Sequence, residues 1–204
     1  MNAKPRWIVG MTGASGAIYG VRLVEQLLDR GVFVDLVVTD AGWRVLQEEL
    51  GWNPARRREE LRRAFGDDRG RWTLHAIRDF GAPIASGSVP TEGMVVVPCS
   101  MGTLSGIARS ASDNLLERAA DVVLKEGRRL ILVPRETPLH AVHLELMLAV
   151  SRLGARIVPA MPAFYHRPRT LDDLVDFMVG KLLDQMGFDH DLFRRWGEAN
   201  GDEA

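Results

Sequence analysis

Trp7-Ile8-Val9-Gly10-Met11-Thr12-Gly13-Ala14-Ser15-Gly16-Ala17 is the stretch that decides the fold of this 204-residue chain. Residues 7–11 predict a buried strand, and the glycines that follow predict a tight turn. From Ala17 to Arg30 apolar residues recur at helical spacing, and Gly31 stands where helices commonly end in a left-handed residue. Val32 to Val38 predicts a second strand. This βαβ unit implies a parallel sheet with a right-handed crossover.

The same alternation of strands and helices continues along the chain. Two continuous apolar runs, Met94–Val97 and Leu130–Val133, are typical of central parallel strands that are buried on both faces. We also expect short strands over 72–77 and 156–159 and helices over 41–50, 102–109, 114–126, 139–153 and 171–186. The fold class is therefore a doubly wound, mostly parallel α/β sheet, a Rossmann-like or flavodoxin-like three-layer sandwich. We expect one domain over 1–204, whose tail from residue 187 serves assembly or the active site.

Composition narrows the class of protein. The chain has 26 Lys and Arg against 27 Asp and Glu, a balance that argues against nucleic-acid binding. The basic segment 54–71 mixes both signs and predicts a solvated helix and turn. No apolar run approaches the roughly 20 residues of a membrane helix, and the first residues show no signal-peptide core. The single cysteine, Cys99, excludes an internal disulfide, so we expect a cytoplasmic protein.

Ligands of open α/β sheets bind beyond the carboxyl ends of the strands. The first such end is the turn Gly10–Gly16, where glycines let the backbone approach a ligand and the next helix offers N–H groups to an anion. Its spacing departs from G-x-G-x-x-G, and a tight turn without a ligand is the alternative. The second end carries Thr39, whose hydroxyl could bind a phosphate, and Asp40, which would suit a ribose.

The other two strand ends also carry polar residues. Ser100 to Thr103 open a helix and predict another turn that binds an anion or a ring, whereas Cys99 has no charged neighbour and is expected to be a packing residue. The pair Arg135–Glu136 at a buried strand end is costly unless it serves a site; an exposed ion pair is the alternative. His140 and His143 lie near one helical face but lack further ligands, so we predict no metal site.

Together, these strand ends resemble the flavin prenyltransferase family, the UbiX-type proteins. The resemblance covers nearly the whole chain and is carried by residues 11–17, 98–104, 113–121, 133–136, 159–167 and 195–198. It implies transfer of a dimethylallyl group from dimethylallyl phosphate to N5 and C6 of reduced FMN, without a metal. It also implies a homo-oligomer, a dodecamer with sites built between subunits, and a prenylated FMN product that serves a UbiD-type decarboxylase.

The resemblance also implies roles for individual residues. It assigns FMN binding to Gly13, Ala14, Ser15, Thr39, Ser100, Met101, Gly102, Thr103 and Arg135. It assigns binding of the prenyl donor to Lys125, Arg135, Tyr165, Lys181 and Trp196. Trp196 would be an apolar wall or a C-terminal packing anchor. Lys181 stands where some relatives have Arg and lacks the bidentate fork.

The resemblance implies three catalytic residues. Glu136 exchanges a proton with the leaving phosphate, Ser15 orients that phosphate, and Glu49 assists ring closure. The neighbouring Gln47 and Glu48 leave the register of Glu49 open by one residue. Positive side chains would stabilise the departing phosphate, while apolar walls shield the allylic cation from water.

Four alternatives remain open. An FMN-dependent decarboxylase of a cysteine-containing substrate would need a histidine shortly before the central strand, where residues 85–88 have none and His75 comes too early. Direct decarboxylation of an aromatic acid is a second reading, and a non-enzymatic FMN carrier is a third. A nicotinamide oxidoreductase is disfavoured by the glycine spacing. The sequence does not decide between a monophosphate and a diphosphate donor.

Overall fold

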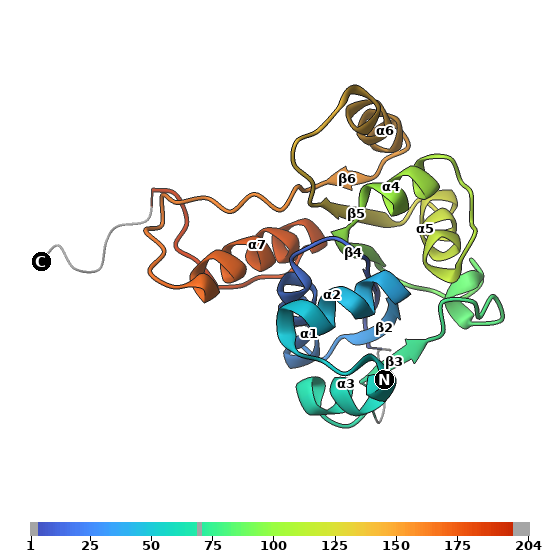
Figure 1. Cartoon of the computed structure of the whole chain (residues 1–204), viewed down its shortest axis with the longest axis horizontal. Helices are drawn as coiled ribbons and strands as arrows, with labels where there is room; N and C mark the ends of the chain where they lie inside the picture. The colour runs from blue at the N-terminus through green and yellow to red at the C-terminus, as the bar shows by residue number, and fades with distance from the viewer. Residues whose placement is uncertain (1–3, 69–70, 198–204) are drawn as a thin grey trace, which may run out of the picture. The chain divides into compact units, whose positions relative to one another are not determined.

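The computed structural model describes residues 4–68 and 71–197 (Figure 1). The chain divides into two compact units, of which the first ends at Ala160 and the second begins at Met161. That second unit starts well before residue 187, where the sequence predicted a tail. The prediction of a single domain over 1–204 stays a prediction, and residues 198–204, including Glu198 of the C-terminal motif, lie outside the described residues.

The first unit is built on a six-stranded parallel sheet, as predicted. Its strands are β1 (Arg6–Met11), β2 (Phe33–Val38), β3 (Trp72–His75), β4 (Gly93–Cys99), β5 (Arg129–Pro134) and β6 (Arg156–Ile157). They pair in the order β3-β2-β1-β4-β5-β6. This is a doubly wound order in which the chain changes direction across the sheet between β1 and β4, the point where such sheets bind ligands.

Helices cover both faces of this sheet (Figure 1). The helix α1 (Ala17–Asp29) contacts both α2 (Asp40–Leu50) and α3 (Arg57–Phe65), the last of which follows a 3-10 turn at Pro54–Arg56. On the other face lie α4 (Met101–Ala108), α5 (Leu115–Lys125) and α6 (Ala141–Arg152), with a 3-10 turn at Pro83–Ala85. The predicted three-layer sandwich is confirmed, and the predicted elements differ from the observed ones by one or two residues at their ends.

Across residues 161–197 the second unit holds one helix, α7 (Leu171–Met186). Thr170 and Asp173 cap its first turn reciprocally, and Gly187 ends it with a φ of 87°. The chain then turns back on α7, where Gly180 leaves no room for a side chain: an added Cβ would lie 2.5 Å from Phe193 and 2.6 Å from His190. No helix in the described part of the chain is long and apolar enough to cross a bilayer.

A buried ion cluster ties the first three strands together. Asp35 of β2 is fully buried and accepts hydrogen bonds from Arg6 of β1, at 2.5 and 2.8 Å, while His75 of β3 lies 2.7 Å from it. Burial alone would raise the pKa of Asp35, but the hydrogen bonds from Arg6 and His75 hold it below its ordinary value. The cluster therefore keeps a carboxylate charged inside the fold.

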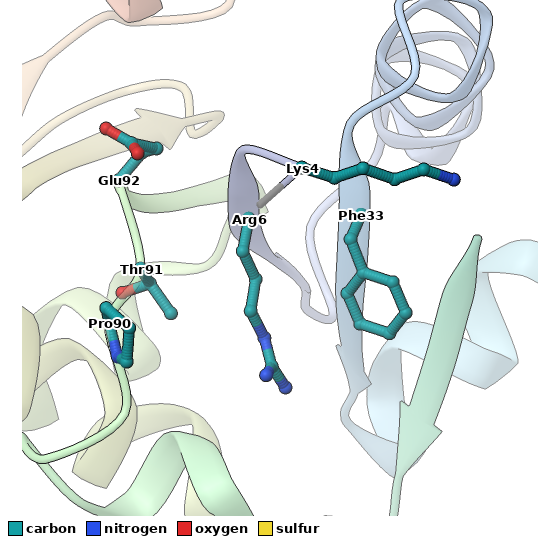
Figure 2. A pocket seen from close by; sticks show the side chains of 6 residues that line it. All are labelled: Lys4, Arg6, Phe33, Pro90, Thr91 and Glu92. Atoms are coloured by element: carbon teal, nitrogen blue, oxygen red, sulfur yellow. The ribbon is translucent and has the colours of Figure 1, made fainter. Parts of the chain in front are cut away.

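A pocket of about 520 Å³ lies at the amino ends of the strands, beside this cluster. Lys4, Arg6, Phe33, Pro90, Thr91 and Glu92 line it. Figure 2 shows the Arg6 side chain extending between Phe33 and the 90–91 segment, and its guanidinium lies 5.1 Å from the Phe33 ring centroid. The pocket is at the opposite edge of the sheet from the predicted site.

Candidate functional site

One buried hydroxyl joins the first and third strand ends at the carboxyl edge. Thr12 Oγ1 donates to the Pro98 carbonyl oxygen at 2.9 Å and accepts from the Ser100 N–H at 2.7 Å. Because Thr12 follows β1 and Ser100 follows β4, this hydroxyl fixes the two predicted binding turns side by side at the switch point. Sequence reasoning gave Thr12 no role, because a threonine at the start of a glycine-rich turn has the pattern of a turn residue.

The first turn is shaped by a close approach of two backbone segments. A Cβ on Gly13 would lie 2.6 Å from Cβ of Ala41 in α2, so only glycine fits there. Ala14 is buried and Ser15 is exposed. Of these residues the structure leaves the Ser15 side chain accessible to a ligand.

The N-terminus of α1 is not the vacant anion site that the sequence predicted. The Glu49 carboxylate accepts hydrogen bonds from the Gly16 N–H, at 3.0 Å to both oxygens, and from the Ala17 N–H at 2.9 Å. The prediction of unpaired N–H groups is wrong for these two residues, because α2 supplies an internal anion. An incoming phosphate would meet a carboxylate there.

The same contact resolves the register of the α2 carboxylates. Of the neighbours Gln47, Glu48 and Glu49, it is Glu49 that reaches the first turn. Burial and then the nearby Glu49 carboxylate raise the pKa of Tyr19, which therefore stays protonated at neutral pH. The structure places Glu49 at the carboxyl edge; its part in ring closure stays a prediction.

Two further predicted FMN-binding hydroxyls begin helices. Thr39 Oγ1 accepts from the Gly42 N–H at 2.9 Å, which starts α2. Ser100 Oγ accepts from the Thr103 N–H at 3.3 Å, which starts α4, and its hydroxyl lies 3.1 Å from Thr103 Oγ1. As caps these side chains are held in fixed rotamers, and the Thr39 hydroxyl hydrogen is still available to a ligand.

The first turn of α4 contains one residue that packs in the core, Met101, and one that is exposed, Gly102. Met101 packs in the core cluster, so only its backbone could meet FMN. Gly102 is exposed, and a Cβ built on it meets no atom within 4 Å. Asp40, considered for a ribose, instead pairs with Arg57 at 2.9 Å.

Arg135 and Glu136 follow β5 and are not paired with each other in the described chain. The Arg135 Nε atom is buried and has no hydrogen-bond partner among the described residues. Glu136 is exposed, and its carboxylate accepts from the Thr137 N–H of its own loop at 3.0 Å. The alternative of an exposed ion pair between these two residues is therefore wrong. A buried donor without a partner beside an accessible carboxylate is an arrangement that suits an anionic ligand.

Cys99 is a packing residue, as expected. It is fully buried in the core cluster, and burial raises the pKa of its thiol to about 12. The His140 and His143 rings stack with centroids 3.5 Å apart. Within residues 4–68 and 71–197, no group of three or more His, Cys, Asp or Glu side chains could hold a metal ion.

Lys125 lies at the other edge of the sheet from Arg135. It ends α5, and the chain then reaches the first residue of β5 at Arg129, so this helix end lies at the amino edge. There its ammonium pairs with Glu126. Since Arg135 follows the last residue of β5, one copy of the chain does not bring these two predicted phosphate ligands together.

The second unit contains the other three residues that were predicted to bind the prenyl donor, Tyr165, Lys181 and Trp196. The Tyr165 ring lies edge-on to Trp196, with centroids 5.3 Å apart, and edge-on to Phe177 at 5.9 Å. Lys181 Nζ lies 3.7 Å from Asp184 Oδ2, and Asp184 also binds Arg195 at 2.9 Å. Sequence reasoning missed Asp184, because an acidic residue on a polar helix face is usually solvated.

Comparison with known proteins gives the site a family. A family model described as Flavoprotein matches residues 1–183. A flavin prenyltransferase UbiX from Halalkalibacterium halodurans is 56% identical over 195 residues, which are 96% of this chain and 95% of the relative. The chain belongs to the flavin prenyltransferase family.

Solved structures place the fold in the same family. AnUbiX, crystallised with FMN and dimethylallyl pyrophosphate, is 40% identical with a TM-score of 0.88; the match covers 97% of this chain and all of that one. A dodecameric FMN-dependent UbiX-like decarboxylase from Escherichia coli is 45% identical with a TM-score of 0.86, covering 95% and 100%. The recognition of flavin prenyltransferases from sequence is thus confirmed.

Proposed function

We propose that this chain joins the dimethylallyl group of dimethylallyl phosphate to reduced FMN at N5 and C6, as a flavin prenyltransferase. The observation that carries the proposal is the arrangement after β5, where the buried Arg135 Nε lacks a partner among the described residues and the neighbouring Glu136 carboxylate is accessible. A cation that holds a phosphate and an acid–base group beside it are what loss of an allylic phosphate requires.

The residues of the carboxyl edge fit FMN. The exposed Ser15, the open Gly102 and the unpartnered Arg135 Nε offer a hydroxyl, a surface without a side chain and a buried donor. Gly13, Ala14, Thr39 and the backbone of residues 100–103 would form the rest of the cradle. When bound, reduced FMN supplies the electron-rich ring that accepts the allylic carbon.

The chain contributes charge, a proton carrier and exclusion of water. Arg135 neutralises the phosphate as the C–O bond breaks, and Lys125 and Lys181 add positive charge from the copies of the chain that complete the site. Ser15 orients the phosphate, and Glu136 exchanges a proton with it. The Tyr165 and Trp196 rings form an apolar wall beside the allylic fragment. Glu49, placed at the first turn, serves the later ring closure.

A homo-oligomer completes the proposal. The helix α6 exposes Val142, Leu144 and Leu148 by 51–54%, and Leu153 just beyond it by 55%. Exposed apolar side chains gathered on one helix of a single chain are typical of an interface. We assign it to contacts between copies in a dodecamer, like that of the Escherichia coli relative. Leu148→Asp should yield smaller assemblies by light scattering, and an unchanged mass would contradict this assignment.

We also propose a cytoplasmic enzyme whose product serves a UbiD-type decarboxylase. The FMN-carrier alternative needs the binding turns but no accessible Glu136. Direct decarboxylation of an aromatic acid lacks an electron sink among these residues other than the flavin. Residues 85–88, which form the end of a 3-10 turn and the loop after it, contain no histidine for the cysteine-decarboxylase alternative.

The mass of the flavin product tests the function. Purified protein is incubated anaerobically with reduced FMN and dimethylallyl monophosphate, and the mass of the extracted flavin is measured by mass spectrometry. We expect a gain of one C5H8 unit, which heat-treated protein does not give. Unmodified FMN with both the monophosphate and the diphosphate would overturn the proposal in favour of the carrier.

A further inference from the structure

We propose that Asp184 is the positioning residue of the donor subsite: it orients Lys181 toward the phosphate and holds Trp196 against Tyr165 by anchoring Arg195. This inference rests on the proposed function and extends it to residues that do not touch the reacting atoms. All of the contacts that carry it lie within the second unit.

The helix α7 sets the first half of the arrangement. Lys181 and Asp184 are three residues apart, so they share one face of the helix. Their charged atoms lie 3.7 Å apart, which is an ion-pair distance but too long for a hydrogen bond. The carboxylate therefore orients the ammonium while leaving its three N–H donors available for a phosphate.

The segment after α7 occupies the hydrogen-bonding positions of the same carboxylate. Arg195 donates to both Asp184 oxygens, at 2.9 and 3.3 Å, and His190 Nε2 lies 3.2 Å from Oδ1. The His190 side chain is fully buried, and Asp184 itself is 21% exposed. Burial alone would raise the pKa of Asp184, but Arg195 above all holds it below its ordinary value, so the group is a carboxylate at neutral pH.

This anchor fixes the aromatic wall. Trp196 follows Arg195 directly, and its ring meets Tyr165 edge-on at 5.3 Å. Arg194 adds a hydrogen bond of 3.1 Å to the Tyr165 carbonyl oxygen. Trp196 is otherwise 81% exposed, so little else in the described part of this unit restrains it. One carboxylate thus sets the spacing between a phosphate-binding cation and the rings that would cover an allylic chain.

The first test compares Asp184→Asn with Asp172→Asn, an equal charge change at an exposed position in the first turn of the same helix. For Asp184→Asn we expect the KM for dimethylallyl monophosphate to rise about tenfold, with kcat within about threefold. Asp184→Glu should recover most of the loss, and Asp172→Asn should match the wild type. An unchanged KM in Asp184→Asn would overturn the inference.

Two readouts do not depend on turnover. Calorimetry of the monophosphate donor binding to protein loaded with oxidised FMN should show the same tenfold loss. Amide hydrogen exchange across residues 188–197 should accelerate in Asp184→Asn but not in Asp172→Asn. Gly180→Ala would clash with His190 and Phe193 without changing any charge. It should also accelerate exchange and lower the affinity for the monophosphate donor. Wild-type exchange rates in both Asp184→Asn and Gly180→Ala would overturn the inference.

A double variant tests whether Asp184 acts through Lys181. If it does, the losses of donor affinity in Lys181→Ala and Asp184→Asn will be less than multiplicative when combined. Fully multiplicative losses would contradict the role. Failure of the proposed function is distinguishable, because the wild-type protein would then leave FMN unmodified, whereas failure of this inference leaves wild-type prenylation intact.

Discussion

The two edges of the sheet use their arginines in opposite ways. At the amino edge, Arg6 donates to the buried Asp35, and Arg128 donates to the carbonyl oxygens of Val89 and Gly87 at 2.9 and 2.7 Å. At the carboxyl edge, Arg135 keeps a buried Nε without a partner in the described chain. The amino-edge arginines stabilise the fold, whereas Arg135 is held ready for a ligand.

The difference separates two meanings of a buried charge. A buried guanidinium whose donors are used is a structural group, and removing it leaves its carboxylate unpaired. A buried donor that lacks a partner costs free energy in the free protein and recovers it when an anion binds. The large pocket beside Arg6 therefore does not outrank the carboxyl edge as a candidate site.

The largest effect is expected at Glu136. Glu136→Gln should lower the rate of flavin prenylation at least a hundredfold, about 3 kcal/mol in the barrier, because the amide cannot exchange the proton. Within residues 4–68 and 71–197 its carboxylate bonds only to its own loop, so the melting temperature should stay within about 2 °C. Single-turnover kinetics and calorimetry measure both; a rate within threefold of wild type would contradict the role.

The next effect falls on stability at the opposite edge. Arg6→Met should lower the free energy of unfolding by about 3 kcal/mol, the low end for breaking a buried pair, because the Arg6 side chain is 29% exposed. Prenylation at 25 °C should not change. The matched variant Arg135→Met should show the opposite pattern. Its free energy of unfolding should stay within about 1 kcal/mol of the wild type, whereas its affinity for FMN should be lost. Urea titrations measure the stability of both variants, and FMN titrations measure their affinity for the flavin. Equal losses of stability and of FMN affinity in the two variants would refute the comparison.

The same cluster predicts a smaller, pH-dependent effect. Because the folded-state pKa of Asp35 is below its ordinary value near 3.9, the stabilisation is fully present above that value and is lost as the pH falls through the lower, folded-state pKa. Urea unfolding from pH 6 to pH 3 should show this loss in the wild type and a shallower one in Asp35→Asn. If the free energy of unfolding fell equally with pH in the two proteins, Asp35 would not be the source of the pH-dependent stabilisation.

The smallest effect is expected at Cys99. With its thiol pKa raised to about 12, almost no thiolate is present at pH 8, and the side chain is fully buried. Iodoacetamide should modify the native protein at less than about 1% of the rate for the urea-unfolded chain. Mass spectrometry measures this, and rapid native labelling would show that the β4 end opens.

Helical and strand periodicity sufficed for the fold because the central strands and the helices that cover them have strong apolar patterns. Some of the helix ends that differed are fixed by caps, such as Ser100 before α4 and Asn114 before α5, whose side chains accept from the next turn. The parallel direction of the strands followed from the βαβ unit, whereas the order of the six strands comes from the structure. The division at Ala160 was not predicted, because the prolines of residues 159–170 indicate a loop without showing that a compact unit ends there.

The site was predicted less completely, for a reason visible in Asp35. A lone aspartate in an apolar strand marks a buried charge, but its partners lie 29 and 40 residues away in sequence, and no local pattern identifies them. The contact of Glu49 with the first turn has the same character, because 33 residues separate it from Gly16. Lys125 differs: its place at the end of a helix that leads into β5 already implied the amino edge.

The contact between Glu49 and the start of α1 also bears on how tightly a ligand can bind. With the Gly16 and Ala17 N–H groups already bonded, the turn at residues 13–16 is ordered by folding itself. An arriving flavin has no loose backbone to immobilise there, so its association is spared that entropy cost. Preorganisation of this kind favours a rigid aromatic ligand, and it makes the α2 carboxylate part of the scaffold on which affinity is built.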